Sequence, residues 1–159
     1  MNKAFLLLGT NLGSREQNLN TAKELIKKYS VIVQTSSIYE TAAWGKTDQP
    51  TFLNQALEIE TKLEAADLMH TILAIEKKMG RERTEKYAPR IIDIDILFFN
   101  TEHYNELSLK LPHPEIQNRR FVLVPMAEIA GSFEHPTLRK TIQQLLNDCA
   151  DRLEVRKYP

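Results

Sequence analysis

Residues 90–99 read Arg-Ile-Ile-Asp-Ile-Asp-Ile-Leu-Phe-Phe, an apolar run interrupted by Asp93 and Asp95. The length of this run and its isoleucines and phenylalanines predict a strand over residues 91–99. Side chains two residues apart on a strand lie on the same face, about 6.6 Å apart along it. We therefore expect Asp93 and Asp95 to share one face of the strand, opposite a row of isoleucines.

The segments around this strand predict alternating strands and helices. Short apolar or β-branched runs predict strands, and apolar residues at helical spacing predict helices. In chain order we expect a strand at residues 4–8, a helix after the capping-box pair Ser14 and Gln17, strands at 31–39 and 52–61, a helix that ends at Gly80, the strand at 91–99, and a last helix near 138–149 with Cys149 in the core.

The order strand, helix, strand, strand, helix, strand is typical of an α+β fold with a ferredoxin-like βαββαβ core. We expect an antiparallel sheet with flanking helices and extra C-terminal helices, in a single domain over residues 1–159. Such folds carry many functions, so the fold alone indicates no activity.

Composition excludes several classes of protein. Lys plus Arg and Asp plus Glu each number 21, so a zero net charge gives no general attraction to nucleic acid or to anionic membranes. One cysteine excludes an intrachain disulfide and a four-cysteine zinc site. The apolar run near the N-terminus is too short for a signal peptide or a membrane span. We expect a cytoplasmic protein.

The two aspartates favour a metal site. Like charges in an apolar strand repel each other and lose hydration, and a divalent cation relieves both penalties. Only oxygen ligands are available there, which favours Mg²⁺ over Zn²⁺. An Asp-x-Asp pair is, however, also compatible with solvated edge residues or with pairing to an arginine.

Basic residues precede the strand. Arg81, Arg83, Lys86 and Arg90 could bind a polyphosphate, since arginine donates to phosphate oxygens in pairs, or they could form a solvated face balanced by glutamates. His113 lies between two prolines, where it could contact a phosphate or be an ordinary loop residue.

Aromatic residues lie in or beside the expected loops. Trp44, Phe52 and Phe121 could stack on a flat heterocycle or be core residues. Asn54 shares the face of Phe52 and offers both a donor and an acceptor for a heterocycle edge. The sequence has no Gly-x-x-x-x-Gly-Lys and no Gly-x-Gly-x-x-Gly phosphate motif.

Short blocks in order over nearly the whole chain carry a resemblance. The longest is residues 86–97, and the others are Gly9-Thr10-Asn11-Leu12-Gly13, Ser36-Ser37-Ile38-Tyr39, Asp48-Gln49-Pro50, Phe52-Leu53-Asn54, Gly80-Arg81-Glu82-Arg83, Pro112-His113-Pro114 and Asn118-Arg119-Arg120-Phe121. Together they are similar to the 6-hydroxymethyl-7,8-dihydropterin pyrophosphokinases of folate biosynthesis, which transfer pyrophosphate from ATP to a hydroxymethyl-pterin and release AMP.

The resemblance implies roles for individual positions. Two Mg²⁺ ions would be held by Asp93 and Asp95. The transferred phosphates would be contacted by Arg81 and Arg90. The ATP side would include Glu76, Arg83, Lys86, Tyr87, Ile96, Lys110, His113 and Arg119. The pterin side would include Thr41, Ala42, Ala43, Trp44, Phe52, Asn54 and Phe121.

Family members often have a Pro-Pro pair and a leucine where this chain has Ala42-Ala43-Trp44, and the loop from Arg83 to Pro89 is about one residue shorter. The expected partners are ATP and the pterin, without nucleic acid, membrane or an obligate protein partner. Other readings of the residues are a nucleotidyl or sugar transferase with an Asp-x-Asp pair, or an RNA-recognition module on the same fold.

Overall fold

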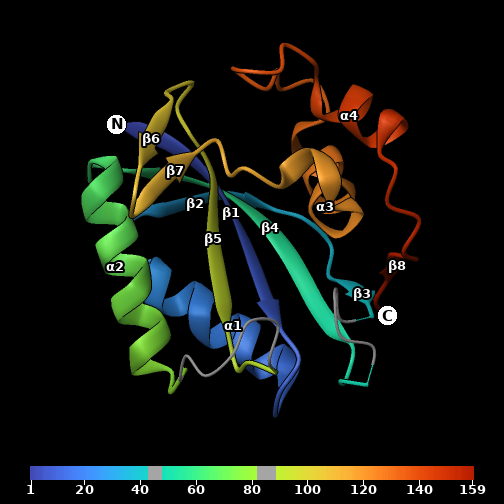
Figure 1. Cartoon of the computed structure of the whole chain (residues 1–159). Coiled ribbons are helices and arrows are strands. Elements are labelled where there is room, and N and C mark those ends of the chain that lie inside the picture. Colours follow the sequence, from blue (N-terminus) through green and yellow to red (C-terminus); the bar gives the residue numbers. More distant parts are fainter. Residues whose placement is uncertain (43–47, 82–88) are drawn as a thin grey trace.

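The computed structural model describes residues 1–42, 48–81 and 89–159, and within them the chain forms a six-stranded antiparallel sheet flanked by helices (Figure 1). The strand order is β5-β1-β4-β3-β8, and β2 pairs with β4. In chain order the elements are β1 (Asn2–Thr10), α1 (Arg15–Ile26), β2 (Val31–Thr35), β3 (Tyr39–Thr41), β4 (Phe52–Thr61), α2 (Ala65–Lys78), β5 (Asp93–Phe99), β6 (Tyr104–Glu106), β7 (Leu109–Leu111), the 3-10 turn η1 (Ile116–Asn118), α3 (Arg120–Ala130), α4 (Ile142–Asp148) and β8 (Arg156–Lys157).

The predicted α+β fold with a ferredoxin-like core is confirmed. From β1 to β5 the chain follows the expected order of strands and helices, except that the strand predicted at 31–39 forms both β2 and β3, and β1 lies between β4 and β5 with antiparallel pairing on both sides. The later helices α3 and α4 pack on the sheet face opposite α1 and α2 (Figure 1).

The sheet separates two apolar clusters. Alternate residues of β1, among them Leu6 and Leu8, pack with α1 and α2, and the intervening Phe5 and Leu7 pack with α3 and α4. This alternation follows from the period of two along a strand. The sheet therefore has one face under each pair of helices.

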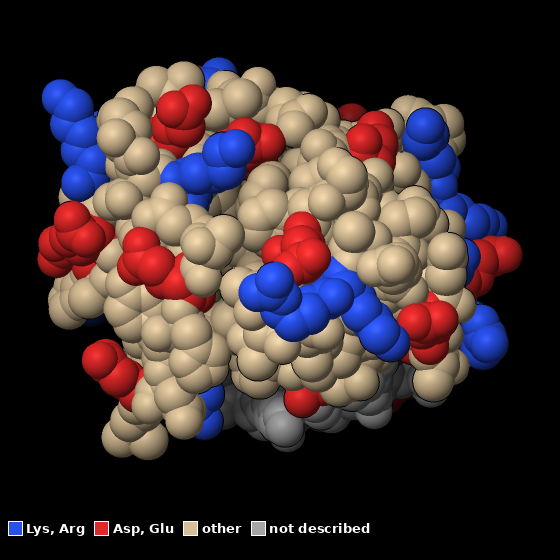
Figure 2. Space-filling view, turned by 90° about the horizontal axis from the view of Figure 1, so that it is seen from above, with Lys and Arg blue, Asp and Glu red and all other residues tan. Residues whose placement is uncertain are grey.

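Charges on the surface are mixed. On the face that Figure 2 shows, acidic and basic side chains are interspersed, and neither sign forms a continuous patch there. The longest helix in the described part of the chain, α2, has 14 residues, and no helix of that part is long and apolar enough to span a membrane.

The predicted strand at residues 31–39 is divided into β2 and β3 at Ser36. The Ser36 hydroxyl accepts a hydrogen bond from the backbone N–H of Ala56 at 2.9 Å. At Ser36 a side-chain oxygen thus takes the place of a backbone carbonyl in the hydrogen bonding with β4. The regular pairing is interrupted there, and β2 and β3 pair with different stretches of β4.

One predicted helix start is wrong, and one predicted capping box does not form although α1 begins directly after Ser14 as expected. The Ser14 hydroxyl makes no capping hydrogen bond, because the Ser14 backbone (φ −80°, ψ 89°) differs from the extended conformation typical of an N-cap. The last helix begins at Ile142 rather than near residue 138, because Thr141 and Gln144 form a reciprocal capping box. Cys149 at its C-cap is buried, as predicted.

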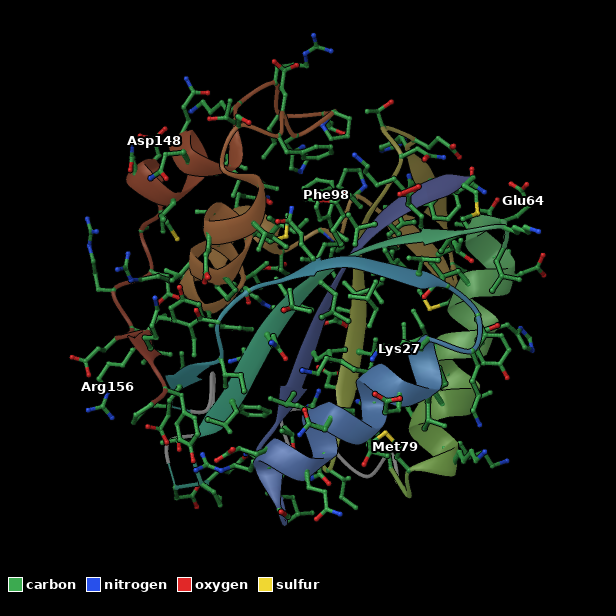
Figure 3. All side chains as sticks on the ribbon, turned by 180° about the vertical axis from the view of Figure 1, so that it is seen from behind. Lys27, Glu64, Met79, Phe98, Asp148 and Arg156 are labelled. Atoms are coloured by element: carbon green, nitrogen blue, oxygen red, sulfur yellow. The ribbon has the colours of Figure 1, made fainter. Side chains whose placement is uncertain are left out.

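His135 is a buried polar residue in the loop before α4. Its side-chain Nδ1 accepts hydrogen bonds from the backbone N–H groups of Thr137 (3.2 Å) and Leu138 (3.0 Å). Its ring lies edge-on to Phe98, the side chain labelled in Figure 3, at 5.4 Å between centroids. Burial lowers the pKa of His135, so the neutral ring that accepts these bonds is favoured.

We expect His135 to make stability dependent on pH. The unfolded histidine, with a pKa of about 6.5, takes up a proton before the folded one, so the unfolding free energy falls as pH decreases from about 7 toward the folded pKa. His135→Asn keeps an acceptor for the two N–H groups but does not titrate. Urea unfolding at several pH values should show a shallower decrease for this variant than for the wild type, and parallel curves would contradict the assignment.

Candidate functional site

One row of residues across the sheet links the predicted metal and heterocycle positions. Gly9 of β1 is in register with Asp93 of β5 on one side and with Asn54 of β4 on the other. Residues in register across antiparallel strands share a face, and neighbouring strands are about 4.8 Å apart. Asp93 and Asn54 thus lie on one face, about 10 Å apart across two strand spacings.

Gly9 is required by the close approach of Asn54. A Cβ atom at Gly9 would lie 2.8 Å from Asn54 Oδ1 and 3.7 Å from Phe52 Cδ1. Any larger residue would therefore displace the Asn54 side chain, which lies over the centre of the row.

Asp93 is held by two arginines. Arg81 Nη1 donates to Asp93 Oδ1 at 2.7 Å, and Arg90 Nη1 lies 3.1 Å from Asp93 Oδ2. Of the alternatives for the Asp-x-Asp pair, pairing with arginine is therefore seen for Asp93. The pairing of Asp93 with Arg81 and Arg90 is compatible with a phosphate site, because the same guanidinium groups can also donate to phosphate oxygens.

Glu76 of α2 fixes the position of Arg81. Its Oε2 accepts from Arg81 Nη1 at 2.6 Å and from the backbone N–H of Ile94 at 2.8 Å. Glu76 is buried, and the side chain of Arg81 is only 9% exposed. A buried carboxylate so placed holds the guanidinium beside Asp93.

The carboxyl group of Asp95 has a strongly raised pKa. Burial, together with repulsion from Asp93, raises the pKa of Asp95 to about 8 despite the opposing charge of Arg119. Within the described residues no hydrogen bond or ion pair joins the Asp95 carboxylate to another group. A cation beside it would lower that pKa and satisfy the carboxylate.

The donor set fits magnesium better than zinc. In the described part of the chain, His, Cys, Asp and Glu form no cluster of three or more that could hold a metal. Two carboxylates with water and substrate phosphates are, however, the usual Mg²⁺ environment. The pair of aspartates therefore suits Mg²⁺ bound together with a phosphorylated substrate.

His113 and Arg119 lie on the α3 side of the pair. The His113 backbone N–H donates to Leu97 O at 3.0 Å, and its Nδ1 accepts from the Glu115 N–H at 3.1 Å. This bond leaves Nε2 as the N–H donor of the neutral ring. Burial and then the charge of Arg119 lower the pKa of His113, which favours that neutral form.

The predicted pterin residues lie at the other end of the row. Asn54 Nδ2 donates to Thr41 Oγ1 at 3.3 Å, and both residues are buried. Phe52 begins β4 and Phe121 lies in the first turn of α3, and both rings are half-buried. Arg119 also reaches this side, with its Cζ 5.8 Å from the centroid of the Phe121 ring.

Other predicted residues lie apart or cannot be placed. The Ile96 side chain is buried in the α1 and α2 cluster, on the face opposite Asp95. Lys110 is exposed on the β6–β7 hairpin, and Ala42 is exposed after β3. Ala43, Trp44, Arg83, Lys86 and Tyr87 lie outside the described residues.

Sequence reasoning gave no role to Asn11, which joins three segments of the site. Its Oδ1 accepts from the Arg90 N–H at 2.9 Å, and its Nδ2 donates to Gln49 Oε1 (3.0 Å) and Pro50 O (3.1 Å). Asn11 is 1% exposed. Its position in the Gly9–Gly13 turn was the only available signal, because its partners are distant in sequence.

Comparison with known proteins identifies the family. A family model described as 7,8-dihydro-6-hydroxymethylpterin-pyrophosphokinase (HPPK) matches residues 5–131. The 2-amino-4-hydroxy-6-hydroxymethyldihydropteridine pyrophosphokinase of Bacillus subtilis (strain 168) is 42% identical over 135 residues, which cover 84% of this chain and 81% of that protein. The protein of the same name from Methylorubrum extorquens is 38% identical over 158 residues, covering 97% of this chain and 100% of that protein.

Solved structures share the fold. The crystal structure of Plasmodium falciparum HPPK-DHPS A437G matches with a TM-score of 0.77 at 20% identity, over 92% of this chain and 45% of that one. The present chain thus spans less than half the length of that solved chain, and the likeness concerns the fold.

We expect Asn11→Ala to lower the unfolding free energy by about 1–3 kcal/mol, because it removes the hydrogen bonds of a buried side chain to the Arg90 N–H and the Pro50 carbonyl. Asn20→Ala, on the exposed face of α1, is the matched control and should change it by less than about 0.5 kcal/mol. Urea unfolding measures both. An equal effect of the two substitutions would show that Asn11 does not join these segments.

Proposed function

The chain belongs to the 7,8-dihydro-6-hydroxymethylpterin-pyrophosphokinase family, and we propose that it performs that family's reaction on the sheet face between β5 and α3. It is an enzyme of folate biosynthesis that transfers pyrophosphate from ATP to the hydroxymethyl group of 6-hydroxymethyl-7,8-dihydropterin, giving AMP and the pterin diphosphate.

The row from Asp93 through Gly9 to Asn54 carries the assignment of the site. It puts charged groups suited to a triphosphate at one end and buried amide and hydroxyl groups suited to a heterocycle at the other. The separation of about 10 Å leaves room for a pterin and the phosphates to meet between them. We therefore assign ATP to the β5 end and the pterin to the β3–β4 end.

Asp93 and Asp95 would hold two Mg²⁺ ions, each completed by water and phosphate oxygens. When bound, Mg²⁺ neutralises the charge of the triphosphate and orients it for transfer. The raised pKa of Asp95 supports this assignment, because a carboxylate in that position gains most from a cation.

The arginines would stabilise charge during transfer. In the reaction a bond forms between the hydroxymethyl oxygen and the β-phosphorus, the bond from that phosphorus to the oxygen bridging it to the α-phosphorus breaks, and AMP leaves with the electron pair while the hydroxyl loses its proton. Glu76 and Asp93 both accept from Nη1 of Arg81, and its guanidinium has further donors for phosphate oxygens. Arg90 would act beside it, and Arg119 and the Nε2–H of His113 would donate from the α3 side.

On the pterin side, Phe52 and Phe121 would stack on the ring, and Asn54 with Thr41 would bind its polar edge. The remaining predicted positions, including Ala43, Trp44, Lys86, Tyr87, Lys110 and Ile96, stay predictions. We also propose that residues 1–159 act as one unit without an obligate protein partner, because the Bacillus subtilis and Methylorubrum extorquens proteins match over most of their lengths. A cytoplasmic location is part of the same proposal.

Products distinguish this reaction from the alternatives. Labelled ATP should give AMP and a pterin diphosphate, whereas a nucleotidyl transferase would release pyrophosphate. The zero net charge, and the mixed charges on the one face that Figure 2 shows, do not favour an RNA-binding module.

We expect Asp95→Ala to lower turnover with saturating Mg²⁺ and ATP by at least about 10²-fold, because the phosphate charge loses its counter-ion. The matched control is Asp148→Ala, at an exposed residue paired with Lys140, and it should keep turnover within about twofold. AMP release measures both. Near-normal turnover of Asp95→Ala would contradict the metal assignment.

We expect Arg81→Ala to reduce kcat by about 10²-fold while pterin affinity changes less than about twofold, because its contact strengthens as phosphate charge shifts. It should also lower Tm, since buried Glu76 loses its cation. Calorimetry for the pterin and steady-state kinetics below the Tm test this, with Arg152→Ala as an exposed control. A loss of pterin affinity with unchanged kcat would show that Arg81 does not stabilise the charge that develops during transfer.

A further inference from the structure

The C-terminal end of the chain adds a strand to the sheet beside the pterin side. β8 pairs with β3 so that Lys157 is in register with Tyr39 and Arg156 with Glu40, and the Tyr158 N–H donates to Ile38 O at 2.8 Å. Figure 3 shows Arg156 at this margin of the molecule. The segment lies beyond residues 5–131, which the family model matches.

Beneath this margin Arg15 of α1 joins Glu40 of β3 to Thr51, the residue that precedes β4. Its Nη1 donates to Thr51 Oγ1 (2.8 Å), Thr51 O (3.1 Å) and Glu40 Oε2 (3.3 Å). The Thr51 hydroxyl also donates to Glu40 Oε2 at 2.8 Å. Arg15 therefore holds together Glu40 and Thr51, where the chain leaves β3 and enters β4. We call this pair of residues the β3–β4 neck.

The ring of Tyr158 lies against the Arg15 guanidinium group. Arg15 Cζ lies 5.8 Å from the centroid of the Tyr158 ring, and the Tyr158 hydroxyl donates to Glu16 Oε1 at 3.0 Å. Arg156 Nη2 adds a contact of 3.7 Å to Glu40 Oε1. The C-terminal segment thus restrains both Arg15 and the carboxylate that Arg15 binds.

The residues that follow Glu40 and Thr51 are the predicted pterin ligands. Thr41 and Phe52 are in register with each other, and each directly follows a residue that Arg15 binds. Because successive side chains point to opposite faces, Arg15 holds the neck on the α1 face while Thr41 and Phe52 face the site.

We propose that Tyr158, through Arg15, is a positioning residue that holds the β3–β4 neck in the conformation that binds the pterin. This inference rests on the proposed assignment of Thr41, Phe52 and Asn54 to the pterin side. It gives a C-terminal segment outside the matched family region a function in substrate affinity. The segment touches no substrate itself.

The test is calorimetric titration of the pterin into protein saturated with Mg²⁺ and a non-hydrolysable ATP analogue. Tyr158→Ala removes the ring over Arg15 and should weaken pterin binding about threefold to tenfold, while affinity for the ATP analogue stays within about twofold. Tyr158→Phe keeps the ring and should restore most of the affinity. A chain ending at Val155 should weaken pterin binding at least as much as Tyr158→Ala.

Two references make the result decisive. Tyr29→Ala, at an exposed tyrosine after α1, should leave both affinities unchanged, and Asn54→Ala should weaken pterin binding. Normal pterin affinity of Tyr158→Ala with weakened Asn54→Ala would overturn the positioning role alone. Normal affinity of Asn54→Ala would overturn the pterin assignment and this inference with it. If Tyr158→Ala lowered the affinities for the pterin and for the ATP analogue equally, its effect would be a general structural one. That result would also overturn the positioning role.

Discussion

Two carboxylates of like charge on one face of a largely apolar strand are the constraint around which the site is built. Lost hydration and then repulsion from Asp93 oppose ionisation of Asp95, and its pKa is raised accordingly. Asp93 is instead compensated by Arg81 and Arg90, and Glu76 holds Arg81 in place. The arrangement keeps acidic and basic groups close together, which is the condition for binding a metal and a phosphate chain in the same place.

The rest of the sheet orients the substrates relative to this pair. Antiparallel register fixes Asn54 two strands from Asp93, and a glycine between them leaves room for the amide. Asn11 joins the turn after β1 to the segments before β4 and β5. Positions set by strand register and buried hydrogen bonds are rigid, so little reorganisation is needed when phosphate charge moves.

The sequence predicted the fold class and the face of the two aspartates, because both depend on local periodicity. It could not predict that Ser36 divides a strand, because that break depends on a bond to Ala56 of a distant segment. The capping box expected at Ser14 occurs instead at Thr141, since backbone conformation decides whether a hydroxyl can reach the first turn. The role of Asn11 was likewise invisible, because its partners come together only on folding.

The bond from the Ile94 N–H to Glu76 has a consequence for how this molecule behaves in concentrated solution. β5 is the outermost strand of its sheet, and the free N–H and C=O groups of such a strand can pair with a strand of another chain. Glu76 occupies one of these donors with a charged group that a neighbouring backbone would have to displace. The carboxylate that orients Arg81 therefore also makes this N–H of the edge strand unavailable to a strand of another chain.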